Sequence, residues 1–215
     1  MQLATTQLIS LAVDSVHLEG MLELPVNARG IVLFAHGSGS SRHSPRNNFV
    51  ARVFHEKGMG TLLLDLLTLA ENLDYQTRFD IPLLTHRLLV ATRWIKQHTP
   101  TQSISIGYFG ASTGAAAALQ AAAALREDIM AVVCRGGRPD LAGQHDLTKV
   151  TAPTLLLVGG RDEEVIDLNQ RAYTLLPCTK EMMIVPGATH LFEEPGALQE
   201  VARQAANWFS QYLTS

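Results

Sequence analysis

The chain has 215 residues, of which 47% are hydrophobic and 17% charged, and its formal net charge is -3. This length suits a single domain, residues 1–215, and the composition is that of a globular protein with a sizeable core. The mild negative charge and the lack of a long basic run argue against nucleic acid as a partner, because binding phosphates needs clustered lysine and arginine.

The N-terminal part of the chain predicts a β-hairpin, then a strand, a helix and another strand. Residues 7–13 and 16–25 are β-type runs on either side of an Asp14-Ser15 turn, which indicates an antiparallel pair. The run at 30–37, GIVLFAHG, is continuously apolar and ends in glycine, as in a strand buried on both faces of a parallel sheet. The next elements are a helix and a second buried strand, at about 47–57 and 61–66.

The rest of the chain alternates helices with four more buried strands. After a polar loop at 68–77, helices are expected at about 78–98, in the alanine-rich stretch up to 125, at 167–176 and at 197–212. The strands are expected at 104–110, 129–137, 154–160 and 181–187. This alternation predicts an α/β fold, a doubly wound and mostly parallel sheet with an N-terminal antiparallel hairpin and helices on both faces. The connections are too short to form a cap domain over the sheet.

Polar and glycine residues follow each parallel strand, which places a site at the carboxyl edge of the sheet. Residues 110–114, GASTG, match the G-x-S-x-G nucleophile elbow, with a strand before and a helix after. Ser112 would lie at a sharp turn, and side chains at positions 110 and 114 would clash where the strand and helix cross, so both positions are glycine. The alternative is a glycine-rich turn in which Ser112 only caps the helix.

A serine nucleophile needs a base and an acid that orients the base, in the order serine, acid, histidine after such an elbow. Asp162 follows the strand at 154–160 and His190 follows the last strand, so both would reach the same edge. Taken alone, Asp162 is more often a turn or helix-cap residue, and His190 is a loop residue. With Ser112 they predict a catalytic triad. The rival acids, which lie further into the loop or helix, are Glu163, Glu164 and Asp167.

Two backbone N–H donors are expected to stabilise the oxyanion formed in acyl transfer. One is the amide of Thr113, directly after the nucleophile. The other is assigned to Ser38, in the loop at 36–40 (HGSGS) that follows the first parallel strand. The alternative for this loop is a flexible connector. His36 is expected to be a structural histidine beneath the loop rather than a base.

Arginines near this edge offer a contact for the substrate. Arg135 and Arg138, in CRGGRPD, come after the apolar run at 130–133 of the fourth parallel strand, and the planar arginine fork pairs well with a carboxylate or phosphate. We assign substrate binding to Arg135, with a loop-bracing salt bridge as the alternative. Arg42 and Arg46, with His43 between them, follow the 36–40 loop and either form an entrance or belong to a purely structural loop.

In these residues the sequence resembles the α/β-hydrolase superfamily, and within it the dienelactone-hydrolase-like branch. The likeness extends over nearly the whole chain from about Gly20, through AHGSGSSRHSPRN, GASTG, CRGGRPDLAG, LLLVGGRDEEV and PGATHLFEEPG. Dienelactone hydrolases proper use a cysteine nucleophile, whereas residue 112 is serine, so their lactone specificity is not carried over. The resemblance implies a small hydrolase without a cap that cleaves esters or related acyl compounds.

We therefore expect a serine hydrolase that cleaves a small ester through an acyl-enzyme, in the carboxylic-ester or dienelactone-hydrolase-like class. The alternatives are a non-catalytic hydrolase-fold protein that binds a ligand or partner, and an esterase site that regulates a larger complex. No cofactor or metal is expected, because no His, Cys or Asp group has zinc-like spacing. Apolar runs fall far short of the roughly 20 residues that span a bilayer, and neither a signal peptide nor a disulfide framework is evident, so we expect no membrane partner and a cytoplasmic location.

Overall fold

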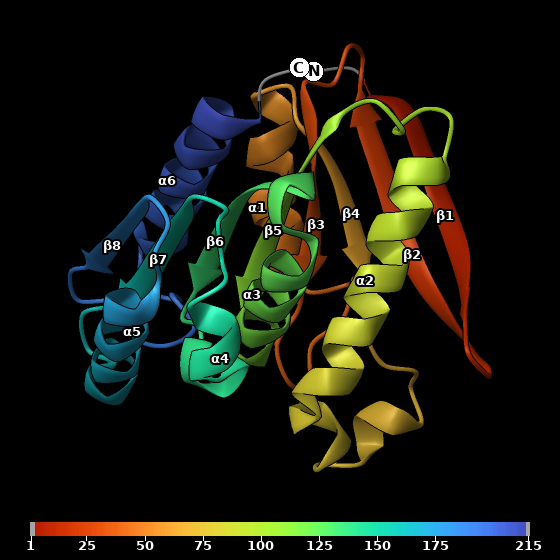
Figure 1. The fold of residues 1–215 in the computed structure, drawn as a ribbon. Helices are drawn as coiled ribbons and strands as arrows, with labels where there is room; N and C mark the ends of the chain where they lie inside the picture. The colour runs from red at the N-terminus through yellow and green to blue at the C-terminus, as the bar shows by residue number, and fades with distance from the viewer. Residues whose placement is uncertain (1–2, 214–215) are drawn as a thin grey trace.

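The structure is a computed structural model, and it describes residues 3–213. Its centre is an eight-stranded sheet with the strand order β1-β2-β4-β3-β5-β6-β7-β8 (Figure 1). The strands are β1 (Leu3–Val13), β2 (Val16–Pro25), β3 (Gly30–Ala35), β4 (Gly60–Leu64), β5 (Ser105–Ala111), β6 (Ile129–Arg135), β7 (Thr154–Gly159) and β8 (Lys180–Val185). Each strand expected from the sequence is present, but β8, expected to be buried, lies at the edge of the sheet and is mostly half-buried or exposed.

The N-terminal hairpin joins the sheet by antiparallel pairing, since β1 pairs with β2 and β2 pairs with β4. The remaining neighbours, from β4 through β3, β5, β6 and β7 to β8, are parallel. In register, Ala35 of β3 lies beside Gly110 of β5, and Ala111 lies beside Arg135 of β6. The carboxyl ends of these three strands therefore form one edge, where the residues that follow each strand meet.

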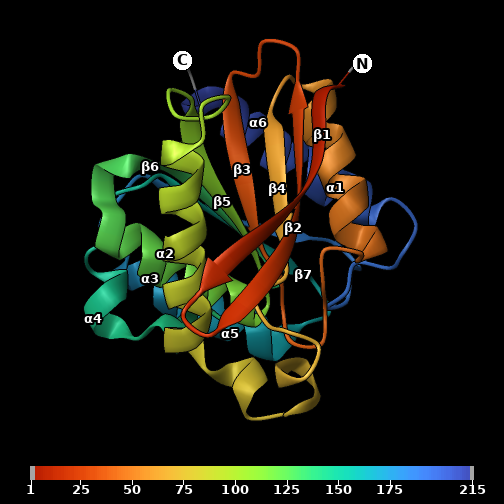
Figure 2. The same cartoon turned by 90° about the vertical axis from the view of Figure 1, so that its right-hand side faces the viewer.

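Helices cover both faces of the sheet, as the doubly wound prediction requires (Figure 2). On one face lie α1 (Pro45–Glu56) and α6 (Ala197–Tyr212). On the other lie α2 (Ile81–Gln97), α3 (Thr113–Leu125), α4 (Gln144–Leu147) and α5 (Glu163–Leu175). Each face buries its own apolar cluster, one containing Phe54 and Phe209, the other Leu88 and Tyr108. No helix between residues 3 and 213 is long and apolar enough to cross a membrane.

The helices α2 and α5 begin several residues away from the predicted starts, each directly after an aspartate in the N-cap position. α2 begins at Ile81 rather than at 78, since the Asp80 carboxylate accepts the amide N–H of Leu83 at 3.0 Å. α5 begins at Glu163 rather than at 167, with Asp162 in the N-cap position. The sequence also does not predict α4 or the short 3-10 turn before it.

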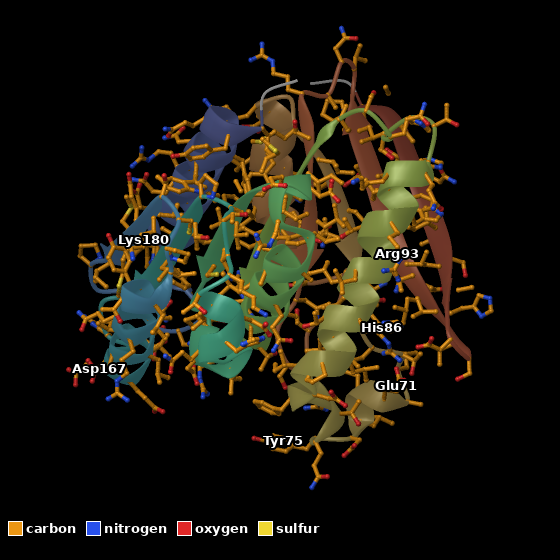
Figure 3. The ribbon with its side chains drawn as sticks, in the orientation of Figure 1. Glu71, Tyr75, His86, Arg93, Asp167 and Lys180 are labelled. Carbon is orange, nitrogen blue, oxygen red and sulfur yellow. The ribbon has the colours of Figure 1, made fainter. Side chains whose placement is uncertain are left out.

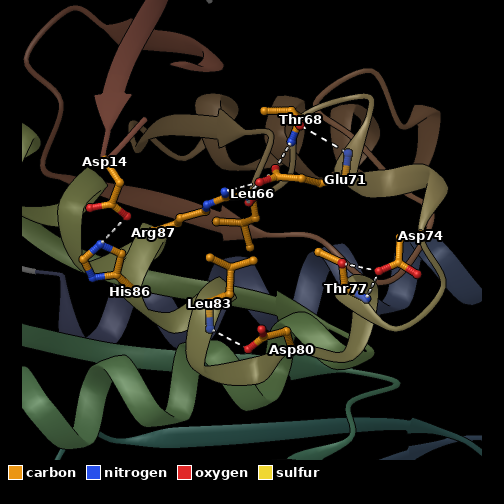
Figure 4. Close-up of polar contacts among 10 residues, drawn as sticks. All are labelled: Asp14, Leu66, Thr68, Glu71, Asp74, Thr77, Asp80, Leu83, His86 and Arg87. Carbon is orange, nitrogen blue, oxygen red and sulfur yellow. Dashed lines mark hydrogen bonds and ion pairs between the residues drawn. The ribbon is translucent and has the colours of Figure 1, made fainter. Parts of the chain in front are cut away.

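The connection from β4 to α2 is braced by an arginine of α2 (Figure 4). The Arg87 guanidinium donates to the carbonyl oxygen of Leu66 at 2.7 Å and to the two carboxylate oxygens of Glu71 at 2.6 and 2.7 Å. The hydrogen bonds from Arg87 lower the pKa of Glu71 to about 2. They hold the connection close to the sheet, and Tyr75 projects from its outer side (Figure 3). The connection forms no cap domain.

Candidate active site

Ser112 lies between the end of β5 and the start of α3, at a turn with an unusual backbone. Its φ of 50° and ψ of -122° lie outside the regions that residues with a side chain normally adopt. The amide N–H of Ser112 donates to the carbonyl oxygen of Arg135 at 3.3 Å, and its carbonyl accepts from the amides of Ala115 and Arg138, each at 3.0 Å. Backbone strain of this kind persists only where the surroundings hold it in place, and it gathers at functional sites.

The two glycines of the elbow allow β5 and α3 to cross at close range. A Cβ built on Gly110 would lie 2.5 Å from the Cα of Ala115, and one built on Gly114 would overlap the carbonyl oxygen of Ala35. Both neighbours are backbone atoms, which cannot turn aside as a flexible side chain can. The clash expected from the sequence for side chains at positions 110 and 114 would therefore occur in this turn.

The structure brings His190 and Asp162 into direct contact. His190 follows β8 and Asp162 follows β7, and the ring Nδ1 lies 2.6 Å from the Asp162 Oδ2. The side chain of Asp162 is 16% exposed and that of His190 is 38% exposed, so the aspartate lies behind the ring. The rival acids Glu163, Glu164 and Asp167 are exposed, and Asp167 points outward from α5 (Figure 3).

A small cavity of about 170 Å³ is lined by several of the residues predicted for the site, though not by Asp162 or Thr113. Its lining includes Gly37, Ser38, Arg46, Ser112, Arg135 and His190.

No hydrogen bond joins the Ser112 hydroxyl to the His190 ring in the described part of the chain. Such bonds are often long in an empty site and shorten when the substrate binds. The cavity has three further lining residues to which the sequence assigns no role, Ser40, Ala111 and Leu191, and each belongs to a motif quoted for the site. No cluster of three or more His, Cys, Asp or Glu with metal-binding geometry occurs within residues 3–213.

The loop predicted to hold the oxyanion lies against the nucleophile. A Cβ built on Gly37 would be 2.9 Å from the Cβ of Ser112, and Ser38 next to it lines the cavity. Thr113 is buried as the first residue of α3, where the amides of the first turn have no acceptor within the helix. The structure thus places both predicted donors, Ser38 and Thr113, close to Ser112.

His36 anchors this loop from beneath, in agreement with the structural role expected for it. Its Nε2 accepts the amide N–H of Leu66 at 2.9 Å, and its Nδ1 lies 3.0 Å from the carbonyl oxygen of Gly37. These partners require the neutral ring with the proton on Nδ1. Burial lowers the pKa of His36, because the charged ring would lose its hydration.

Arg135 is the unusual charge of the site. Its side chain is buried at 8% exposure, and it forms no hydrogen bond or ion pair with any described residue; its Nη1 is fully covered. Burial and the positive charge of Arg46 together lower the pKa of Arg135 to about 10. Arg46, also at the cavity, donates to the Glu193 carboxylate at 2.9 Å. A buried cation without an anion is costly, so the cavity favours a negatively charged occupant.

The other candidate arginines have partners elsewhere. Arg138 forms two hydrogen bonds with the Asp140 carboxylate, at 2.9 and 2.8 Å, which is the loop-bracing role. Arg42 pairs with Asp65 and Glu19, and with His43 it lines a separate cavity of about 670 Å³ between the β1–β2 hairpin and the β4–α2 connection. The larger cavity is therefore not the one that contains Ser112. Of the proposed entrance residues, Arg46 alone lines the Ser112 cavity.

No family model matches the chain, but curated proteins that are longer than this chain do match its sequence. The chain is 54% identical over 205 residues to proteins of two Mycobacterium tuberculosis strains, CDC 1551 and H37Rv, that carry the provisional name phosphoribosyl transferase. The match covers 95% of the chain but 46% of those proteins, so the chain spans about half the length of the curated relatives it matches.

Comparison with solved structures gives hydrolases. The crystal structure of a dienelactone hydrolase from Anabaena variabilis is similar at a TM-score of 0.93 and 54% identity, over 97% of this chain and 98% of that one. The esterase Est1E from Butyrivibrio proteoclasticus is similar at a TM-score of 0.81 over 95% of this chain and 98% of that one, but at 16% identity that likeness concerns the fold alone.

Proposed function

This chain belongs to the dienelactone-hydrolase-like branch of the α/β-hydrolase superfamily, and from that premise we propose that it is a serine hydrolase of small acyl esters. Ser112 is the nucleophile, His190 the base and Asp162 the acid that orients the base. The observation that supports this most strongly is the 2.6 Å contact between His190 and Asp162, because His190 lines the same cavity as the strained Ser112.

The contact with Asp162 assigns the protons of the His190 ring. A carboxylate beside Nδ1 accepts a hydrogen bond from a proton that stays on Nδ1, which leaves Nε2 unprotonated and able to take the proton of the Ser112 hydroxyl. As Ser112 Oγ forms its bond to the ester carbonyl carbon, that proton moves to Nε2, and His190 then donates it to the departing alcohol. Water repeats the sequence on the acyl-enzyme and releases the acid.

The oxyanion of each tetrahedral intermediate lies beside the amides of Ser38 and Thr113. The second amide belongs to the N-terminus of α3, where the helix dipole adds partial positive charge. Removal of one such donor typically costs about 3 to 4 kcal/mol of transition-state stabilisation. The cavity of about 170 Å³ suits a small acyl group.

Covalent labelling with a fluorophosphonate probe tests this proposal before any substrate is known. We expect one labelled residue, Ser112, and a purified protein that hydrolyses short-chain esters of 4-nitrophenol. Ser112→Ala is the matched control and should lose both properties while it keeps the melting temperature. A native protein that resists the probe and all esters would favour the non-catalytic binding protein instead.

The transferase name belongs to proteins about twice as long as this chain. The residues that surround Ser112 support hydrolysis, and we propose no phosphoribosyl transfer for them.

A further inference from the structure

The Ser112 cavity contains a positive charge that the protein itself does not neutralise. Arg135 is 8% exposed and has no acidic partner among residues 3–213, whereas Arg138, in the same loop, pairs with Asp140. Arginine remains charged in proteins, so this guanidinium cannot avoid the cost of burial by losing its proton. A buried charge that lowers the stability of the fold and has no partner within it indicates that a bound ligand supplies the opposite charge.

A second guanidinium stands at the same cavity with a partner that can be exchanged. Arg46 contacts Glu193, and the two side chains are 34% and 64% exposed. Exposed pairs of this kind contribute only about 1 kcal/mol or less, so the bond to Glu193 is weak. The Nε of Arg46 is buried without a partner, like the Nη1 of Arg135. An incoming anion can therefore take Arg46 from Glu193 and lie between two cations.

We propose, on the basis of the serine-hydrolase assignment, that the enzyme selects esters of short dicarboxylic acids, with the free carboxylate of the acyl group bound by Arg135 and then by Arg46. The planar fork of arginine holds a carboxylate through two parallel hydrogen bonds. The Glu193 carboxylate is the internal competitor for Arg46, and it returns to that side chain when the product leaves.

The position of Arg135 makes this a contact with the acyl part of the substrate. Arg135 ends β6 directly beside Ala111, and its carbonyl oxygen accepts the amide N–H of Ser112. Arg135 is thus the strand neighbour of the residue that precedes the nucleophile, and both Arg135 and Ser112 line the cavity of about 170 Å³. A carboxylate held there can be only a few bonds from the carbonyl that Ser112 attacks, as in a half-ester of succinic acid.

The test compares two substrates of equal shape, monoethyl succinate and ethyl 4-methylpentanoate, in which an isopropyl group replaces the carboxylate. Hydrolysis is followed by pH-stat titration, and the readout is the ratio of the two kcat/KM values. We expect Arg135→Met to lower the ratio by roughly ten- to a hundredfold, the effect of one charged hydrogen bond. Arg135→Lys, which keeps the charge but loses the fork, should give an intermediate ratio.

Two further variants make the test specific. Glu193→Gln frees Arg46 and should raise the ratio a few-fold, the opposite direction. Arg138→Met removes an equal charge from the same loop and should leave the ratio unchanged. An unchanged ratio in Arg135→Met, or a fall of both rates together with a lower melting temperature, would mean that Arg135 only braces the loop, and the proposal would be wrong.

A binding measurement separates this proposal from the assignment of the reaction. Calorimetric titration with succinate needs no catalysis, and we expect binding to the native protein that is lost in Arg135→Met. Succinate binding without any ester hydrolysis would support the carboxylate site and contradict the assignment of the protein as a hydrolase. Hydrolysis of the neutral ester with neither succinate binding nor a preference for the anionic ester would keep the hydrolase and reject the carboxylate site.

Discussion

At the scale of single residues, Ser112, His190 and Asp162 should behave as one unit, because each proton transfer passes through the same ring. We expect Ser112→Ala and His190→Ala each to lower kcat by as much as roughly 10⁶-fold, and the double variant to be scarcely slower than either. Steady-state kinetics with one 4-nitrophenyl ester checks this. Losses that multiply in the double variant would contradict the triad, since independent groups contribute independently.

His36 gives the protein a stability that depends on pH. Its pKa is lowered in the folded state, so between that value and the ordinary value of about 6.5 the unfolded chain binds more protons than the native protein. The free energy of unfolding therefore falls as the pH drops below about 6.5 and levels off below the folded pKa. Protonation would also break the bond from the Leu66 amide, which needs an unprotonated Nε2.

Thermal unfolding between pH 8 and pH 5 tests this dependence. We expect His36→Asn to melt at a lower temperature than the native protein at pH 8, and the difference to shrink as the pH falls. His55 is also buried with a lowered pKa, so both proteins should still lose some stability in acid. Melting curves that remain parallel across this range would show that His36 does not cause the effect.

The sequence alone predicts which residue types meet at the site, but not each individual partner. Asp162 is preferred to the acids that follow it only by its position in the loop, and that position depends on where α5 begins. Arg135 and Arg138 likewise share one motif, and only the turn after β6 places one beside Asp140 and leaves the other unpaired. The catalytic roles of the predicted residues stay predictions.

At the scale of secondary-structure elements, the crossing of β5 and α3 depends on the absence of side chains. We expect Gly114→Ala to lower the free energy of unfolding by about 3 kcal/mol or to prevent folding, because its Cβ would overlap the backbone oxygen of Ala35. Gly20→Ala is the control, since its Cβ would meet only leucine and isoleucine side chains, at 3.1 Å or more. Urea unfolding of the two variants gives the comparison, and equal stabilities would show that the crossing tolerates a side chain.

Elements with a strong hydrophobic pattern are predictable, and elements set by capping or by tertiary bonds are less so. The fully buried strands β3, β4 and β7 are nearly continuous apolar runs, so all three are found from the sequence. The sequence of the β4–α2 connection predicts only a polar loop, because the bonds that hold the connection in place come from Arg87, a residue of α2. The start of α2 at Ile81 depends in the same way on the Asp80 side chain rather than on periodicity.

At the scale of the whole molecule, the parallel sheet is what gathers the site. Ser112, Asp162 and His190 lie far apart in the sequence, yet each follows a strand whose carboxyl end reaches the same edge. That arrangement follows from the alternation of strands and helices, so the sequence predicts the layout of the site along with the fold. Which charged side chains in the cavity are paired and which are not depends on side-chain packing, and the spacing of residues in the sequence does not predict it.

The strand order also sets a sequence of events during synthesis of the chain. β3 is buried along its whole length between β4 and β5, but β5 lies far later in the chain. At about 5–20 residues per second, the ribosome needs several seconds to make the intervening segment, and through that time β3 has an unpaired edge. Edges of this kind pair with other chains and start aggregation. Protection by a chaperone would therefore matter most after β3 has emerged and before β5 arrives to cover it.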